Sequence, residues 1–230
     1  MENITEQENR LFSEWKQNKH EGYFITDGVV NEHIWRNVAV KVLYLLKEPN
    51  GADEEWDERT YLAEYSKGVV PRSLTVNAII KWQYGIMHGS SIPWDMVVKE
   101  TAKKEVQQEM LSQVCWVNMK KTAGRASVDK QNFASYFAES INVSNLQKQL
   151  TFYKPDIVIC GGGSGYLCRL KGWKNSIWQQ TSRGINYHRE DNVIYIDFWH
   201  PANRGVSGNV LYYTLLDAVD ELYYGKKNMG

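Results

Sequence analysis

The sequence predicts an α/β protein, a three-layer α/β/α sandwich around a central, mainly parallel sheet of four strands. Four short apolar runs, rich in β-branched and aromatic residues, have the length of strands. Segments with helical spacing of apolar residues separate these runs. The runs are apolar throughout, which is typical of parallel strands that helices cover on both faces.

The elements follow one another in a regular order along the chain. The expected strands are residues 37–46, 113–118, 155–160 and 192–198. The expected helices lie in residues 73–89, 99–111 and 142–155, and a last helix ends at Gly225, where glycine is a common stop signal. We expect one domain over residues 1–230, with a long insertion at about 50–97 that belongs to the binding side.

The composition narrows the class of protein. The 230 residues carry 27 basic and 27 acidic side chains, so broad electrostatic adhesion to nucleic acid is not expected, while a local basic face stays open. The polar N-terminus and the lack of a long apolar run predict a cytoplasmic protein without a membrane partner. Cys115, Cys160 and Cys168 lack paired spacing, so we expect reduced thiols, no metal site and no cofactor.

Polar or glycine residues follow all four expected strands. Glu48 follows the first strand, Asn118 the second, the glycine-rich stretch that begins with Gly161 and Gly162 the third, and His200 the fourth. Each residue alone is as well explained by a turn or by a structural histidine. Because ligands bind beyond the carboxyl ends of parallel strands, their shared position predicts one site at this edge of the sheet.

These residues resemble the motifs of the uracil-DNA glycosylase superfamily. The stretch "VLYLLKEPNGADEE" resembles its first motif, "IYIDFWHPANRG" its second, "VCWVNMKKTAG" its base-reading strand, and "KPDIVICGGG" the segment before a later turn. The sequence departs from the family pattern at three positions. Leu46 stands in place of a glycine, Asn50 in place of a tyrosine that blocks the five-position of the base, and Ala202 in place of a serine. The cysteines of the iron–sulfur branches are absent.

The resemblance implies hydrolysis of the N-glycosidic bond of a flipped-out pyrimidine in DNA. Glu48 would orient water and offset charge on the sugar, and His200 would donate a hydrogen bond to the departing base. Asn118 would pair with the base, either uracil or cytosine. Asn50 suggests room for a five-substituent, as in modified cytosines of some viral DNA.

The remaining candidates contact the base or the phosphates. Trp56 either stacks on the base or anchors the insertion, and Lys120, Lys121 and Arg204 would contact phosphates. Arg125 is expected to be solvated surface charge. Strand alternation sends Lys47 to the face opposite Glu48, so we expect simple hydrolysis without a lysine nucleophile.

Two alternatives stay open at this point. One is a metal-dependent hydrolase that uses Glu48, Asp53, Asp57 and His200, and the other is a nucleic-acid- or nucleotide-binding module without turnover. The preferred base, the choice between single- and double-stranded DNA, the biological role in repair or defence, and the oligomeric state are left open by the sequence.

Overall fold

The sheet has seven strands, not four, and is mixed. The computed structural model describes residues 3–18, 22–51, 54–124 and 129–225. The strand order is β1-β3-β2-β4-β7-β6-β5. The strands are β1 Gly28–Val29, β2 Val42–Leu46, β3 Cys115–Asn118, β4 Ile157–Gly161, β5 Gln179–Gln180, β6 Asn186–Glu190 and β7 Val193–Phe198.

The four predicted strands form the parallel centre of the sheet. Strand β2 pairs in parallel with β3 and β4, and β4 pairs in parallel with β7. The three additional strands are antiparallel to their neighbours and lie at the two edges. Strands β1 and β5 have two residues each, and β6 is polar and half-buried, so none has the apolar run that identified the others. The expected sheet of four strands was therefore too small.

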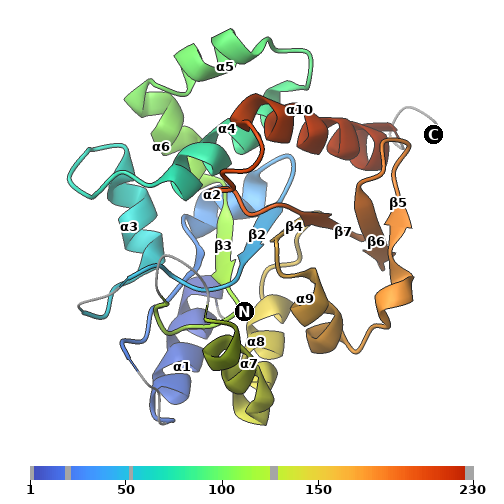
Figure 1. Cartoon of the computed structure of the whole chain (residues 1–230). Helices are drawn as coiled ribbons and strands as arrows, with labels where there is room; N and C mark the ends of the chain where they lie inside the picture. Colours follow the sequence, from blue (N-terminus) through green and yellow to red (C-terminus); the bar gives the residue numbers. More distant parts are fainter. Residues whose placement is uncertain (1–2, 19–21, 52–53, 125–128, 226–230) are drawn as a thin grey trace.

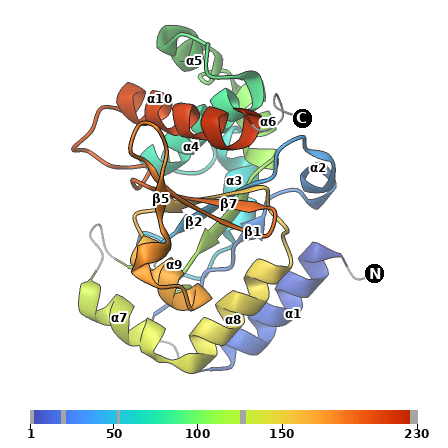
Figure 2. The same ribbon diagram turned by 90° about the vertical axis from the view of Figure 1, so that its right-hand side faces the viewer.

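Helices lie on both faces of the sheet (Figures 1 and 2). On the face that we call the α4/α10 face lie α3 Glu58–Tyr65, α4 Leu74–His88, α5 Trp94–Glu100, α6 Lys104–Ser112 and α10 Gly208–Val219. On the other face, the α8/α9 face, lie α1 Ile4–Lys16, α2 Glu32–Asn37, α7 Lys130–Ala138, α8 Ser140–Thr151 and α9 Ser164–Lys171.

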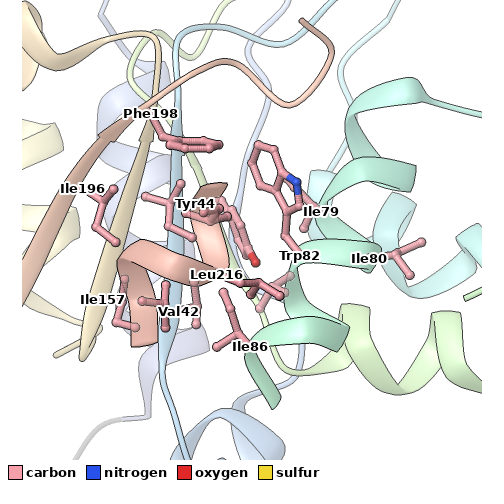
Figure 3. Packing of buried hydrophobic residues seen from close by; sticks show 14 of the residues in the cluster. Val42, Tyr44, Ile79, Ile80, Trp82, Ile86, Ile157, Ile196, Phe198 and Leu216 are labelled. Carbon is pink, nitrogen blue, oxygen red and sulfur yellow. The ribbon is translucent and has the colours of Figure 1, made fainter. Parts of the chain in front are cut away.

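The alternation of β2 divides the core between these two faces. Val42, Tyr44 and Leu46 belong to the cluster on the α4/α10 face, whereas Leu43 and Leu45 belong to the cluster on the α8/α9 face. Figure 3 shows the first cluster, in which residues of the sheet pack against α4 and α10. Because both faces bury apolar side chains, the strand is apolar throughout.

The insertion at residues 50–97 is mostly helical and contributes to the core. Trp82 on α4 is almost completely buried and packs against Tyr44 and Phe198 of the sheet. This segment therefore supports the fold as well as bordering the edge where the predicted site lies. Among the described residues, no helix combines the length and the apolar character needed to cross a membrane.

The predicted helix 99–111 is two helices. Helix α5 ends at Glu100 and α6 begins at Lys104. Residues 101–103 separate them. The backbone N–H and the hydroxyl of Thr101 both donate to the carbonyl of Val97 in the last turn of α5. The last helix continues as a π-helical turn at Asp220–Tyr224.

Candidate active site

The register of the sheet aligns the predicted site residues. Leu46 is paired with Asn118, and Gly161 is paired with Phe198. Leu46 and Phe198 both pack in the core of the α4/α10 face. Glu48 and His200 each lie two residues beyond these paired positions, past the ends of β2 and β7. The register therefore brings a carboxylate, an amide and an imidazole to the same edge of the sheet.

Glycines separate Glu48 from His200. These two residues follow β2 and β7, and β4 lies between those strands, so two strand spacings, or about 10 Å, separate their backbones. Strand β4 ends in Gly161, and Gly162 and Gly163 follow it. A Cβ atom at Gly161 would lie 2.6 Å from Cδ2 of Leu46, so the leucine at this unusual position occupies the space that glycine leaves.

Glu48 forms a buried ion pair with Lys120. The Nζ atom of Lys120 lies 2.9 Å from Oε2 of Glu48, and each side chain is only 5% exposed. The other carboxylate oxygen, Oε1, is buried and has no hydrogen-bond partner among the described residues. The backbone of Gly124 packs directly on the carboxylate, because a Cβ atom there would lie 2.0 Å from Oε1.

A short pairing of two loops keeps Gly124 on the carboxylate. The N–H of Gly124 donates to the carbonyl of Pro49 at 2.9 Å, and the N–H of Gly51 donates to the carbonyl of Gly124 at 3.0 Å. Asn50 lies between these bonds, is exposed, and forms a parallel bridge with Gly124. The turn after β2 and the turn after β3 therefore close together over Glu48.

Asn118 is held by a buried carboxylate that the sequence pattern did not identify. Its backbone N–H donates to Oδ2 of Asp27 at 2.8 Å, and Nζ of Lys121 lies 2.6 Å from Oδ1 of the same residue. Gln149 also donates to Oδ1 of Asp27 at 2.8 Å. Asn118 is 1% exposed, and its Nδ2 atom has no partner among the described residues. The backbone of Asn118 is thus held in place, while the Nδ2 donor of its side chain makes no hydrogen bond to a described residue.

The predicted phosphate contacts of Lys120 and Lys121 are wrong. Lys120 is bound to Glu48 on the α4/α10 face, and Lys121 is completely buried against Asp27 on the opposite face. Two adjacent lysines looked like a basic surface run because their carboxylate partners lie far away in the sequence. Arg204 is exposed and stays a candidate for phosphate contact.

His200 is held in a defined tautomer when neutral. The backbone N–H of Ala202 donates to Nδ1 of His200 at 3.1 Å. Nδ1 must then be unprotonated, so the neutral ring carries its proton on Nε2 and can donate from that atom. Burial of the ring, and secondly the positive charge of Lys47, lower the pKa of His200 below 6.5. The neutral imidazole is therefore favoured near pH 7.

A basic cavity of about 480 Å³ lies beside these residues. It is lined by Lys47, Lys130, Arg169 and the glycine-rich turn at 162–165. The Nζ atom of Lys47 and the Cβ atom of His200 both lie within 4 Å of the point where a Cβ of Gly162 would be. Glu48, Asn118 and His200 line neither this cavity nor a second one of about 440 Å³ between α2 and α4. Lys47, Lys130 and Arg169 therefore gather positive charge at this cavity, whereas Lys120 and Lys121 are buried elsewhere.

Trp56 and the described candidate ligand Asp57 have structural partners. The indole nitrogen of Trp56 donates to Oε2 of Glu58 at 3.1 Å, and the carbonyl of Trp56 accepts from the N–H of Thr26, which favours the anchoring role over base stacking. Within the described part of the chain, no three His, Cys, Asp or Glu side chains gather as metal ligands. Asp53 and Arg125 lie outside the described residues. Asp57 caps α3 and binds Arg59.

Comparison with known proteins assigns the chain to no family. No protein-family model matches the chain, and no curated protein matches it significantly.

Proposed function

We propose that the protein is a DNA glycosylase that hydrolyses the N-glycosidic bond of a flipped-out uracil or five-modified pyrimidine and leaves an abasic site. The observation that carries this proposal is the common position of Glu48, Asn118 and His200 at one edge of the sheet, with unused polar atoms on Glu48 and Asn118. Buried polar atoms normally have partners, so these two atoms would be satisfied by a water molecule or by a bound ligand. Helices on both faces of the sheet support the three-layer arrangement that the family resemblance implies.

The two ends of the scissile bond need opposite charges, and Glu48 and His200 supply them. Cleavage leaves an oxocarbenium-like sugar and a base that carries negative charge. The free Oε1 of Glu48 would accept a hydrogen bond from the attacking water, while the carboxylate offsets the positive charge of the sugar. His200 would donate from Nε2 to the base oxygen, and its neutral tautomer is the form that can do so without a proton from solvent.

Asn118 and Asn50 would determine which base is accepted. The unpaired Nδ2 of Asn118 would donate to a carbonyl oxygen of the extruded base, and flipping exposes that Watson–Crick edge. Asn50 is exposed beside Gly124 and is smaller than an aromatic residue, which supports room for a substituent at the five-position. The DNA backbone would lie along the cavity lined by Lys47, Lys130 and Arg169, near the exposed Arg204.

The test is an excision assay on defined DNA. The protein is incubated with single- and double-stranded oligonucleotides that carry uracil or a five-substituted cytosine, and abasic sites are detected by alkaline strand scission. We expect scission at the modified position with one of these substrates, and no scission with the Glu48→Gln variant. Activity should survive a chelator, because the described residues provide no metal-binding group.

A nucleic-acid-binding module without turnover is the second candidate. The observation that favours it is the enclosure of Glu48, whose carboxylate is bound to Lys120 and covered by Gly124. Binding of DNA at the basic cavity, with no abasic product from any of the substrates above, would support this candidate.

A further inference from the structure

Three cationic side chains from three separate segments line the basic cavity of about 480 Å³. Lys47 follows β2, Lys130 begins α7, and Arg169 lies on α9. The Nζ atom of Lys47 lies 3.8 Å from the point where a Cβ of Gly162 would be, so its charge adjoins the glycine turn. None of the three side chains forms an ion pair with another described residue. The cavity thus gathers three positive charges that the fold does not neutralise.

The glycine turn forms a fixed wall of this cavity. Gly162 has a φ of +73°, which favours glycine, and its N–H donates to the carbonyls of Cys160 and Phe198 at 2.9 and 2.8 Å. The turn is therefore bonded to both β4 and β7. The N–H groups of Ser164 and Gly165, at the start of α9, make no hydrogen bond to a described residue. They add donors to the same cavity that the cations line.

Aromatic packing keeps the charges of α7 and α9 at one cavity. The ring of Tyr166, which also lines the cavity, lies 4.6 Å from Phe133 and 5.0 Å from Phe137 between centroids. The carboxylate of Asp129 precedes Lys130 in the sequence, but it accepts from two N–H groups in the first turn of α7. This acid is therefore committed to a helix cap and not to the cations of the cavity.

We infer that this cavity binds a phosphomonoester, the terminal phosphate of a free nucleotide or of the 5′ end of a DNA strand. A phosphodiester inside a strand carries one negative charge, whereas a phosphomonoester carries close to two at pH 7 and presents three acceptor oxygens. Three unpaired cations in one cavity match the higher charge of the monoester. The inference goes beyond the proposed function, which requires only phosphodiesters at this cavity, and it concerns binding without cleavage.

The test compares ligands that differ in their phosphate. Calorimetric titrations use deoxyadenosine 5′-monophosphate, deoxyadenosine, and the dinucleotide in which one phosphodiester joins two deoxyadenosines with free hydroxyl ends. None of these contains a pyrimidine to excise, so the outcome is independent of the proposed reaction. We expect the monophosphate to bind about 10-fold more tightly than either of the others, or better, which corresponds to one additional charge-assisted hydrogen bond.

A second pair of ligands distinguishes the two sources of the phosphate. A purine-only single strand is titrated with a 5′-phosphate and with a 5′-hydroxyl group. Tighter binding of the phosphorylated strand would assign the cavity to a DNA end. Equal binding of the two strands, with the monophosphate still bound, would assign it to a free nucleotide.

Three variants test whether the cavity is the binding site. Arg169→Gln and Lys130→Gln each remove an exposed cation and should weaken binding of the monophosphate by roughly 10- to 100-fold. Gly165→Asp should abolish binding by repulsion without loss of stability. A Cβ at Gly165 meets no atom within 4 Å, and an acid in the first turn of a helix is favourable to the helix.

The matched control is Lys99→Gln, which removes an exposed, unpaired charge on α5, on the opposite face of the sheet (Figure 2), and should leave binding unchanged. Equal affinity for the monophosphate and the phosphodiester, no detectable binding of the monophosphate, or unchanged binding by Gly165→Asp would overturn the inference. Base excision by the wild type together with any of these results sinks the inference alone. Binding of the monophosphate without excision of any base sinks only the proposed function.

Discussion

Lys120 and Glu48 form an ion pair in which Nζ and Oε2 are 2.9 Å apart and both side chains are 5% exposed. Lys120 thereby uses one oxygen of the carboxylate, while the other, Oε1, is buried against Gly124 without a partner among the described residues. The pair joins the turn after β3 to the turn after β2. It therefore supports the fold and also orients the carboxylate of Glu48, the candidate catalytic group.

Removing one partner of this pair should destabilise the protein. Lys120→Met leaves Glu48 as an uncompensated buried charge, and we expect the free energy of unfolding to fall by about 3–5 kcal/mol. Adding Glu48→Gln removes that charge and should recover much of the loss. Urea denaturation of the single and double variants measures both effects. A loss below about 1 kcal/mol for Lys120→Met would mean that the pair is exposed or absent in solution.

The contact between Gly124 and Glu48 should not tolerate a side chain. In Gly124→Ala the new Cβ would lie 2.0 Å from Oε1 of Glu48, so the carboxylate or the loop must move. A displacement of about 1 Å at a catalytic group lowers rates about 100-fold, and we expect a loss of that order in the excision rate. Gly208→Ala is the matched control, because a Cβ there would lie 3.6 Å from the nearest atoms, those of Trp94, which is an ordinary van der Waals contact. Equal excision rates for the two variants would contradict the position of Glu48 described above.

His200 should titrate below its ordinary range. Burial and the charge of Lys47 lower the pKa of His200 below 6.5, and protonation of Nδ1 would break its hydrogen bond with Ala202. The unfolded chain therefore binds this proton more readily than the folded protein does. The stability that His200 contributes is fully present above pH 6.5 and is lost as the pH falls through the pKa that His200 has in the folded state. Titration by NMR should show a pKa below 6.5.

The effect of the Lys47 charge on the pKa of His200 can be separated from the effect of burial. Lys47→Gln should raise the pKa of His200, because it removes the neighbouring charge, while Lys130→Gln in the same cavity should raise it less. A wild-type pKa at or above 6.5, or no response to Lys47→Gln, would refute the assigned environment of His200.

Glu58 should make stability depend on pH. Burial, and to a smaller extent the charges of Asp27 and Asp57, raise the pKa of Glu58 to about 7, although the hydrogen bond from Trp56 lowers it. The folded protein therefore keeps this proton over the range in which the unfolded chain releases it. Stability from Glu58 should be full below about pH 4.5 and fall as pH rises to about 7.

Glu58→Gln isolates this effect. The glutamine keeps an acceptor for the Trp56 indole but cannot ionise, so the decline in stability between pH 4.5 and pH 7 should become smaller. Denaturation at a series of pH values measures the slope. An unchanged slope would show that Glu58 does not titrate in this range.

The sequence predicted the central strands because their signal is local. β-branched apolar runs identify β2, β3, β4 and β7, and topology then places the residues that follow them at one edge. Short edge strands such as β1 carry no such signal. The break at residues 101–103 between α5 and α6 carries no signal in the apolar spacing.

The errors in the candidate site come from partners that are distant in the sequence. Lys121 was assigned to the surface because Asp27, its buried partner, is 94 residues away, and Lys120 because Glu48 is 72 residues away. Continuing the alternation of β3 beyond Asn118 would have sent the two lysines to opposite faces.

The most direct test of a shared site is base release under single-turnover conditions, measured by chromatography of the free base. We expect release of uracil or of a five-modified pyrimidine by the wild type, with rates about 100- to 10,000-fold lower for both Glu48→Gln and His200→Gln at unchanged DNA affinity. We also expect Asn50→Tyr to shift preference toward bases without a five-substituent. Absence of any released base from these substrates, or full activity of Glu48→Gln, would contradict the proposed reaction.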